Sequence, residues 1–275
     1  MPVPASGLPS VIGLIAGSGR FPILFAEAAR RQGIKVIVAA SKGDASFLIR
    51  FAADEVRWFS SGQFKDMFSF FRQRGIKSVL MAGQIDPDTL FNQNFKADDE
   101  YRAVFAALAD RRCDTIFGAV ADRLKAEGME ILDSTLLLKE FLAPRGTLTR
   151  RAPTEIELAD ITFGLGIAKQ IGGIDIGQTV VVKGKAICAV ESMEGTDRCI
   201  LRGGAIARGG AVVVKASKPN QDSRFDVPVI GPRTIATMAK VHAGLLAIEA
   251  GKTLIIDRDK TVALADRQGI SIVSA

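Results

Sequence analysis

The sequence predicts an α/β fold in two parts, and three observations carry that prediction. In the first half, short apolar segments of strand length alternate with amphipathic helical segments, which is typical of a parallel sheet covered by helices. In the second half the strands are shorter and a hairpin interrupts the alternation, which indicates an α+β domain. The 275 residues, 48% of them hydrophobic and 24% charged, suit one large or two modest globular domains.

The first half opens on the apolar run Val11–Ala16, a buried type of strand that turns on glycines. Helical spacing follows in "FPILFAEAARRQG" and stops at Gly33. Further strands are expected at Ile34–Ala40, Glu55–Ser60, Ile76–Gly83 and Met129–Ser134. Further helices are expected over residues 63–75 and, as a pair, within about residues 98–127. This order of elements predicts a Rossmann-like, doubly wound parallel sheet.

The segment Ala143–Thr154 breaks this rhythm, because it carries two prolines, a glycine and three arginines without apolar periodicity. We interpret it as a linker between a Rossmann-like α/β domain, residues 1–145, and an α+β domain, residues 146–275. In the second domain we expect helices at 155–171, 194–210 and 233–244, a hairpin at 179–192, strands at 211–216, 245–248 and 253–256, and a last helix and strand.

Charge and composition narrow the class of protein. The net charge of +6 is spread evenly, with 20 basic and 17 acidic residues in 1–150 and 16 and 13 in 151–275. This excludes a dedicated nucleic-acid arm but suits an anionic ligand or an anionic membrane surface. The three cysteines have no CxxC spacing, and the single histidine, His242, excludes multi-histidine metal sites. With no signal peptide or apolar run of membrane-spanning length, we expect a cytoplasmic protein.

A glycine loop, "AGSGRFP", joins the first strand to the first helix. Gly17, Ser18, Gly19 and Arg20 are placed where backbone N–H groups at a helix start bind phosphate. Pro22 stands where a dinucleotide fingerprint has its third glycine, and no acid follows the second strand. A mononucleotide or phosphate contact and a plain tight turn both remain open. Gly83 and Gln84 end another strand, so they are candidates to face the same ligand.

Two acidic clusters mark the second half. Glu191, Glu194 and Asp197 follow the hairpin, and we expect Glu194 and Asp197 to share one face of the next helix. Asp222 and Asp226 lie in "SKPNQDSRFDVPVIGP" after a strand end. Carboxylates without histidine suit Mg²⁺, which takes oxygen ligands, and Lys215, Lys218 and Arg224 suit pyrophosphate oxygens. The alternatives are acids that stabilise a first helical turn and a salt-bridge set closed within the loop.

With these residues assembled, the chain resembles the LpxI-type UDP-2,3-diacylglucosamine pyrophosphatases of Gram-negative lipid A synthesis. The resemblance spans nearly the full length and is carried by "IGLIAGSGRFP", "MAGQI", "VVVKGKAICAVESMEGTD" and "VVKASKPNQDSRFDVPVIG". It implies an Mg²⁺-dependent hydrolase with two domains and the substrate between them, which gives UMP and 2,3-diacylglucosamine 1-phosphate (lipid X). It also implies that Asp226, in "RFD", is the essential aspartate.

From the residues and the resemblance together we expect three sets of site residues. The catalytic pair is Asp226 and Asp222, and the metal ligands are these two and Glu194. The expected substrate contacts are Gly17, Ser18, Gly19, Arg20, Gly83, Gln84, Lys215, Lys218, Gln221 and Arg224. The expected partners include the cytoplasmic face of the inner membrane as a peripheral contact, but no nucleic acid, and a homodimer is left open. The competing hypotheses are a nicotinamide-dependent oxidoreductase, from Gly17-x-Gly19, and a non-catalytic nucleotide-sugar or lipid carrier.

Overall fold

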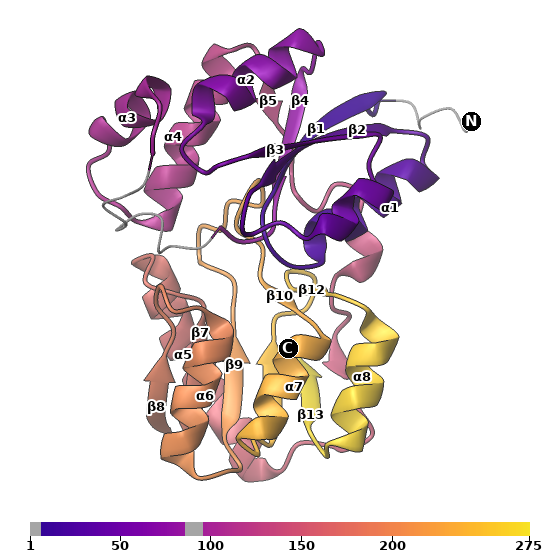
Figure 1. Cartoon of the computed structure of the whole chain (residues 1–275). Coiled ribbons are helices and arrows are strands. Elements are labelled where there is room, and N and C mark those ends of the chain that lie inside the picture. The colour runs from indigo at the N-terminus through magenta and orange to yellow at the C-terminus, as the bar shows by residue number, and fades with distance from the viewer. Residues whose placement is uncertain (1–6, 86–95) are drawn as a thin grey trace. The chain divides into compact units, whose positions relative to one another are not determined.

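The computed structural model describes residues 7–85 and 96–275. The chain forms two compact units (Figure 1). Unit 1 comprises residues 1–138 together with Ser223–Phe225, and unit 2 comprises Lys139–Asp222 and Asp226–Ala275. The chain of the second half therefore returns to unit 1 for three residues, directly between Asp222 and Asp226.

Unit 1 is built on a five-stranded sheet in the order β3-β2-β1-β4-β5. All neighbouring strands are parallel, as the alternation of strands and helices predicts. The strands are β1 (Val11–Ala16), β2 (Lys35–Ser41), β3 (Glu55–Phe59), β4 (Ser78–Ala82) and β5 (Glu130–Ile131). β5 is shorter than the expected strand at 129–134. The chain runs outward from β1 to β3 on one side and from β4 to β5 on the other, so the strand order reverses between β1 and β4.

Helices cover both faces of this sheet (Figure 1). They are α1 (Phe21–Arg31), the 3₁₀ helix η1 (Phe47–Phe51), α2 (Phe64–Gln73), α3 (Asp99–Ala106) and α4 (Cys113–Ala126). On the face of α2 and α4, the fully buried side chains of Phe70, Phe71 and Leu124 pack with Val79 of β4. The phenylalanine-rich segment of α2 is thus core, because its apolar residues recur on one side of the helix.

Unit 2 contains a six-stranded sheet in the order β6-β13-β11-β9-β7-β8. The central strands β13, β11 and β9 are parallel, and β6, β7 and β8 add antiparallel pairs. The strands are β6 (Gly146–Thr147), β7 (Thr179–Lys183), β8 (Ala186–Val190), β9 (Val212–Lys215), β11 (Leu245–Ile248) and β13 (Ser271–Ser274). A separate parallel pair is formed by β10 (Val229–Ile230) and β12 (Leu254–Ile255). The expected hairpin is confirmed, with positive φ at Gly184 and Lys185 in its turn.

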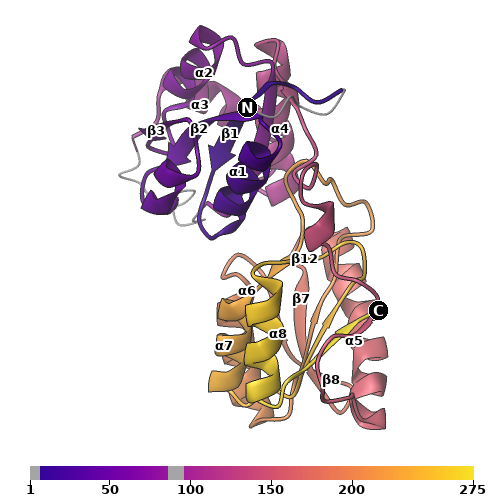
Figure 2. The same cartoon turned by 90° about the vertical axis from the view of Figure 1, so that its right-hand side faces the viewer.

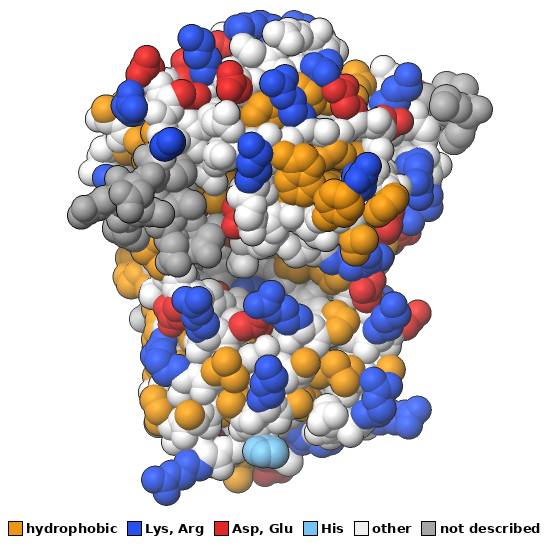
Figure 3. Space-filling model, viewed as in Figure 1, with side chains coloured by type: hydrophobic (Ala, Val, Ile, Leu, Met, Phe, Trp, Pro, Cys, Tyr) orange, Lys and Arg blue, Asp and Glu red, His pale blue; other side chains and the backbone are white. Residues whose placement is uncertain are grey.

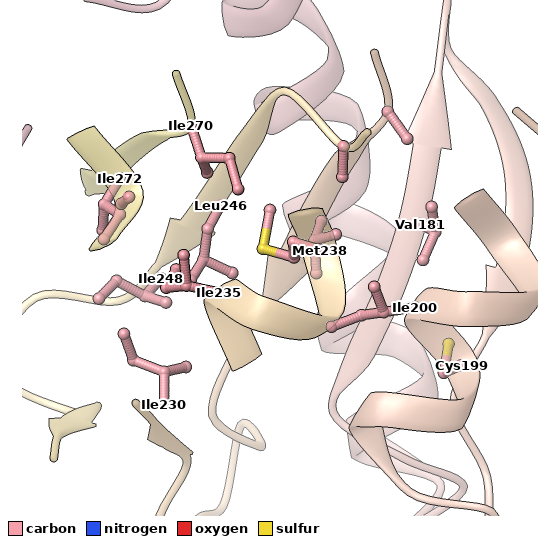
Figure 4. Close-up of a cluster of buried hydrophobic side chains, with 14 of the residues drawn as sticks. Val181, Cys199, Ile200, Ile230, Ile235, Met238, Leu246, Ile248, Ile270 and Ile272 are labelled. Atoms are coloured by element: carbon pink, nitrogen blue, oxygen red, sulfur yellow. The ribbon is translucent and has the colours of Figure 1, made fainter. Parts of the chain in front are cut away.

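The helices of unit 2 are distributed unequally over its sheet (Figure 2). One face carries α5 (Glu155–Gly173) alone, and the other carries α6 (Thr196–Ala207), α7 (Pro232–Lys240) and α8 (Arg258–Arg267). Alternate residues of each strand serve the two faces, so Val213 packs toward α6 and α7, whereas Val212 and Val214 pack toward α5. Figure 4 shows the larger core, in which Ile200 of α6 and Met238 of α7 meet the strands. The fold class, a parallel-sheet domain followed by a mixed α and β domain, is confirmed.

The expectation of a linker at Ala143–Thr154 is wrong. Ala143 is 2% exposed and belongs to the core of unit 2, and β6 within this segment pairs with β13. Arg151 anchors the end of the segment through Glu157 at 2.6 Å and the carbonyls of Gly244 and Gly269. A segment with prolines and arginines and no apolar periodicity can be a short edge strand as well as a linker. The sequence pattern therefore did not distinguish the two. Across the described residues, no helix has the length and apolar character of a membrane span.

Candidate active site

In unit 1, the loop after β1 and the loop after β4 are fastened to each other. Gly17 donates its N–H to the carbonyl of Ala82 at 2.8 Å, and Ser18 donates to the carbonyl of Gln84 at 2.6 Å. A Cβ on Gly17 would overlap the carbonyl group of Gln84, and a Cβ on Gly83 would overlap the carbonyl of Ser18. The structure therefore brings the two glycine motifs together at the strand-order reversal, where parallel sheets bind ligands.

Beyond this contact, the start of α1 remains open to a ligand. Gly19 has φ of +88°, and a Cβ there would meet nothing within 4 Å. Arg20 is the N-cap residue and makes no side-chain cap hydrogen bond, while Pro22 stands in the first turn. The guanidinium of Arg20 lies 3.6 Å from Glu27. Uncapped N–H groups beside a glycine with open space suit an anion. A phosphate contact at Gly19 and Arg20 therefore fits this geometry and stays a prediction.

In unit 2, Asp226 lies in the loop between β9 and β10. Its backbone N–H donates to the carbonyl of Asp222 at 3.0 Å. Gln178 donates Nε2–H to Oδ1 of Asp226, and Lys218 Nζ lies 2.7 Å from Oδ2. Gln178 directly precedes β7, and its carbonyl accepts the N–H of Ala216, which follows β9. The antiparallel pairing of β7 and β9 thereby fixes where the Gln178 amide meets the aspartate.

Lys218 connects Asp226 to a second carboxylate. Its Nζ also contacts Asp175 Oδ1, and the Lys218 and Asp175 side chains are only 6% and 8% exposed. Asp175 adopts a left-handed backbone conformation, φ of +56°, just after α5. Such a conformation is uncommon for a residue other than glycine, so it indicates that the surrounding contacts hold Asp175 in place.

Three buried side-chain atoms around Asp226 have no hydrogen-bond partner within the described part of the chain. They are Gln178 Oε1, Gln221 Nε2 and Asp226 Oδ2; the last has the charge of Lys218 nearby but no aligned hydrogen bond. Leaving a buried polar atom unsatisfied costs about 1–3 kcal/mol, and native proteins contain few such atoms. Their concentration on three neighbouring side chains indicates a site that a polar ligand completes.

A second buried cluster adjoins this one through Gln178, whose backbone N–H donates to Glu191 Oε2 at 3.3 Å. Lys215 Nζ lies 3.9 Å from Glu191, and Thr196 bonds both side chains, donating to Glu191 at 2.7 Å and accepting from Lys215 at 2.8 Å. Burial acts to raise the pKa of Glu191, but the charge of Lys215 and the hydrogen bonds hold it below its usual value. Glu191 therefore remains a carboxylate that compensates the buried Lys215.

A third cluster lies at the same strand ends. Lys169 of α5 donates to the carbonyl of Ser217 at 2.8 Å and pairs with Glu249 at 2.7 Å, and Ser217 Oγ donates to Glu249 at 2.6 Å. Burial favours a higher pKa for Glu249, yet Lys169 and Ser217 lower it. These contacts fix Ser217, the second residue after β9, and hence the backbone that carries Lys218.

The remaining expected site residues take different positions. Gln221 Oε1 accepts the N–H of Lys218 at 2.7 Å, so Gln221 belongs to the cluster around Asp226. The guanidinium of Arg224 lies 5.4 Å from the ring centre of Phe225. Phe225 stacks on Phe117, and Ser223 donates to Asp133 at 2.6 Å. Ser223–Phe225 is thus fixed within unit 1, while the flanking aspartates belong to unit 2.

Glu194 is not brought together with Asp226 by any described contact. Its carboxylate accepts from Ser192 at 2.6 Å and pairs with Arg202. Burial favours a higher pKa, but these bonds lower the pKa of Glu194 to about 2. The expectation that Glu194 and Asp197 share a helix face is wrong, because α6 begins at Thr196 after Gly195, whose φ is +81°. Asp197 instead contacts Arg233 at 2.6 Å.

A divalent metal fits the cluster around Asp226 in a limited way. The described residues contain no group of three or more His, Cys, Asp or Glu side chains arranged to hold a metal. The two unsatisfied oxygens, Asp226 Oδ2 and Gln178 Oε1, are nevertheless the carboxylate and amide donors that Mg²⁺ accepts. Since Mg²⁺ is often held by one or two carboxylates and substrate phosphates, these residues fit a metal that the substrate helps to bind.

Asp175, Gln178, Lys169 and Glu249 are the residues of this site that sequence reasoning missed. Each is a polar residue at or near the end of an element, and each meets its partner from 43 to 80 positions away. The one available signal was their common position at the ends of elements that flank the strand before "SKPNQDSRFD". Without the register of β7 against β9, that position does not reveal a contact.

Comparison with known proteins places the chain clearly. Residues 11–141 match the model of the LpxI N-terminal domain, and residues 144–273 match that of the LpxI C-terminal domain. The UDP-2,3-diacylglucosamine pyrophosphatase LpxI of Caulobacter vibrioides is 35% identical over 278 aligned positions, which cover 95% of this chain and 96% of the relative.

Similarity to solved structures is weak by comparison. The biotin carboxylase subunit of pyruvate carboxylase aligns with a TM-score of 0.27 and 12% identity, over 66% of this chain and 38% of that one. Pyruvate carboxylase of Rhizobium etli aligns with a TM-score of 0.28 and 12% identity, over 70% of this chain and 17% of that one. Two domain models in succession and a full-length relative are decisive: the chain belongs to the LpxI family.

Proposed function

We propose that this protein is an Mg²⁺-dependent hydrolase that cleaves the pyrophosphate of UDP-2,3-diacylglucosamine into UMP and 2,3-diacylglucosamine 1-phosphate. The proposal is supported by the named activity of a relative that matches along its whole length. The observation that carries the chemistry is the half-buried carboxylate of Asp226, whose buried Oδ2 is unsatisfied and lies beside further unsatisfied polar atoms and a lysine.

Asp226 is the residue that acts on the reacting groups. Gln178 holds Oδ1, which leaves Oδ2 to orient the attacking water or to hold the metal together with Asp222 and Gln178 Oε1. When bound, Mg²⁺ would neutralise charge that develops on the phosphate oxygens. Lys218 adds a positive charge 2.7 Å from the same carboxylate, where a phosphate oxygen gains a charge-assisted hydrogen bond.

In unit 1 we assign the nucleotide or sugar phosphate to the start of α1. Gly19 leaves room for a phosphate to approach the backbone, and the helix dipole favours a negative charge there. Gly17 and Gly83 hold the two loops together rather than contacting the phosphate, because the space beside each is filled by the other loop. Arg20 and Gln84 remain the side chains of this region that we expect to reach the ligand.

The test is UMP release from UDP-2,3-diacylglucosamine, measured by chromatography with and without Mg²⁺. We expect Asp226→Asn to lower kcat at least about 100-fold, as removal of one group that acts on the transition state commonly does. Asp99→Asn is the matched control, since that side chain is 96% exposed and its ion pair with Arg102 lies within one helix turn. Activity of the Asp226 variant within a few-fold of the parent would remove Asp226 from the mechanism. Stoichiometric binding without turnover under any divalent metal would favour the carrier.

A further inference from the structure

The short helix η1 exposes large apolar side chains to solvent. It lies between β2 and β3, and only Ile49 faces the interior, at 1% exposed. Phe47, Leu48 and Phe51 are 58%, 57% and 68% exposed. Scattered apolar side chains on a surface are ordinary, but a contiguous group marks an interaction site. Figure 3 shows hydrophobic side chains gathered beside Lys and Arg on the visible face of unit 1.

The exposed rings form an ordered cluster rather than separate side chains. Phe47 stacks on Trp58 of β3, with ring centres 6.4 Å apart, and meets Phe51 edge-on at 6.5 Å. The guanidinium of Arg50 lies 4.6 Å from the centre of the Phe47 ring and 5.7 Å from that of Phe51. Arg30 fixes the end of the turn by donating to the carbonyl of Phe51 at 3.2 Å. The cluster is therefore preorganised for binding.

The charge around this cluster is positive. Residues 30–58 contain six basic and three acidic side chains. The three acids are already engaged: Asp44 accepts from Ser41, Asp54 accepts the N–H of Val36, and Glu55 pairs with Arg74. Arg50 has no ion pair within the described part of the chain, and its charge lies directly over the exposed rings.

Aromatic side chains with arginine at their edge suit the boundary between lipid headgroups and acyl chains. The rings enter the apolar layer while guanidinium groups stay with the phosphates, and anionic lipids attract the excess of positive charge. A second copy of the chain fits less well, because a two-fold contact through this patch would place Arg50 near its own copy.

We propose that one surface patch docks this protein on an anionic lipid bilayer. The patch consists of Phe47, Leu48, Arg50 and Phe51 of η1 and Trp58 of β3. The docking stands on unit 1 alone and does not depend on the hydrolase reaction.

The chain carries a built-in reporter for this proposal, because Trp58 is its single tryptophan. Vesicles of phosphatidylethanolamine and phosphatidylglycerol should shift the emission of Trp58 to shorter wavelength, and brominated acyl chains should quench it. Vesicles of phosphatidylcholine alone should bind more weakly, and added salt should weaken binding to the anionic vesicles only in part. Vesicle sedimentation of the full-length chain measures the affinity.

Variants distinguish membrane binding through the patch from non-specific adsorption of exposed apolar side chains. Phe47→Ser with Phe51→Ser should weaken sedimentation at least about tenfold, because burying one aromatic side chain in an apolar layer is itself a factor of ten or more. Arg50→Gln should weaken it by about threefold to tenfold on anionic vesicles only. The matched control is Ile156→Ser with Ile206→Ser, two isoleucines of unit 2 that are 72% and 61% exposed. Thermal unfolding confirms that each variant is folded.

Four results would overturn the proposal, three from binding or assembly and one from activity. In the first, the parent protein does not bind anionic vesicles. In the second, the phenylalanine variant binds them as tightly as the parent does. In the third, gel filtration shows that the parent is a dimer and the phenylalanine variant a monomer, while the two proteins bind vesicles equally. UMP release from detergent-dispersed substrate should be unchanged in the phenylalanine variant; a parallel loss there would assign the patch to the acyl chains of the substrate instead.

Discussion

The ammonium group of Lys218 lies 2.7 Å from Oδ2 of Asp226 and also contacts the carboxylate of Asp175. One cation therefore compensates two carboxylates in a region where the lysine side chain is 6% exposed. A buried charge that loses its partner is strongly destabilising, whereas the intact pair adds little to stability by itself. The arrangement consequently predicts large effects from single substitutions and smaller effects from paired ones.

Lys218→Met should lower the free energy of unfolding by about 3–5 kcal/mol, because it removes the ammonium group that contacts both the carboxylate of Asp175 and that of Asp226. Asp175→Asn keeps a residue that tolerates the left-handed conformation while removing one of those charges. The double variant should therefore be less destabilised than the sum of the single ones. Urea unfolding of the parent and three variants measures this coupling, and strict additivity would contradict the bridging role of Lys218.

Gln178→Leu tests whether the amide positions Asp226. The substitution removes the donor to Oδ1 and keeps a side chain of similar size, so the carboxylate loses its fixed orientation. We expect kcat to fall about tenfold or more with KM changed little, because misplacement of a reacting group acts on the transition state. The control is Gln268→Leu, which replaces a glutamine at the end of α8. A rise in KM with unchanged kcat would instead make Gln178 a substrate contact.

Gly17→Ala and Gly83→Ala should each destabilise unit 1 by about 1–3 kcal/mol, because the new methyl group would overlap backbone of the opposite loop. Gly118→Ala is the matched control. It lies within α4 and has open space around a Cβ, so it should be neutral or stabilising by up to about 1 kcal/mol. Thermal unfolding compares the three. Equal tolerance of all three substitutions would mean that the two loops are not fastened together.

The sequence is sufficient to predict most of unit 1 and the edge of the sheet where the loops after β1 and β4 meet. Apolar runs of strand length and glycine stops define β1, β2 and β4, and the return of glycines after β1 and β4 indicates where the loops meet. The sequence does not predict that Gly17 and Gly83 allow the two loops to pack against each other. Glycine is needed both where two backbones approach closely and where a phosphate approaches the backbone. Only the structure shows which of these two reasons applies at each position.

In unit 2 the charged loop is recognisable, but its pairing is not. Lys218 and Asp226 lie in the same loop and do meet. The position of Gln178 depends on the register of β7 against β9, and that of Asp175 on where α5 ends. The expectation that Glu194 shares a helix face with Asp197 is wrong for a local reason, because Gly195 turns the chain one residue before the helix begins. Periodicity locates a helix well and its first turn poorly.

The buried pair of Glu191 and Lys215 makes a prediction about pH. The folded-state pKa of Glu191 lies below its unfolded value of 4.5, so its ionised form contributes stability that is fully present above about pH 4.5. That contribution is lost as the pH falls through the folded pKa, since the folded and unfolded states then bind the proton equally. Glu191→Gln removes the carboxylate and leaves Lys215 buried with the hydroxyl groups of Thr179 and Thr196 as its partners in the described part of the chain.

We therefore expect Glu191→Gln to be less stable than the parent near neutral pH by about 1–3 kcal/mol, and the difference to shrink as the pH falls below 4.5. Urea unfolding at a series of pH values measures it, with exposed Glu130→Gln as the control for replacing a glutamate. The comparison uses the difference between parent and variant, because other carboxylates with lowered pKa values, such as Glu249 and Glu194, weaken both proteins alike in acid. A difference that stays constant through this range would show that the carboxylate of Glu191 contributes through its shape and hydrogen bonds, and not through its charge beside Lys215.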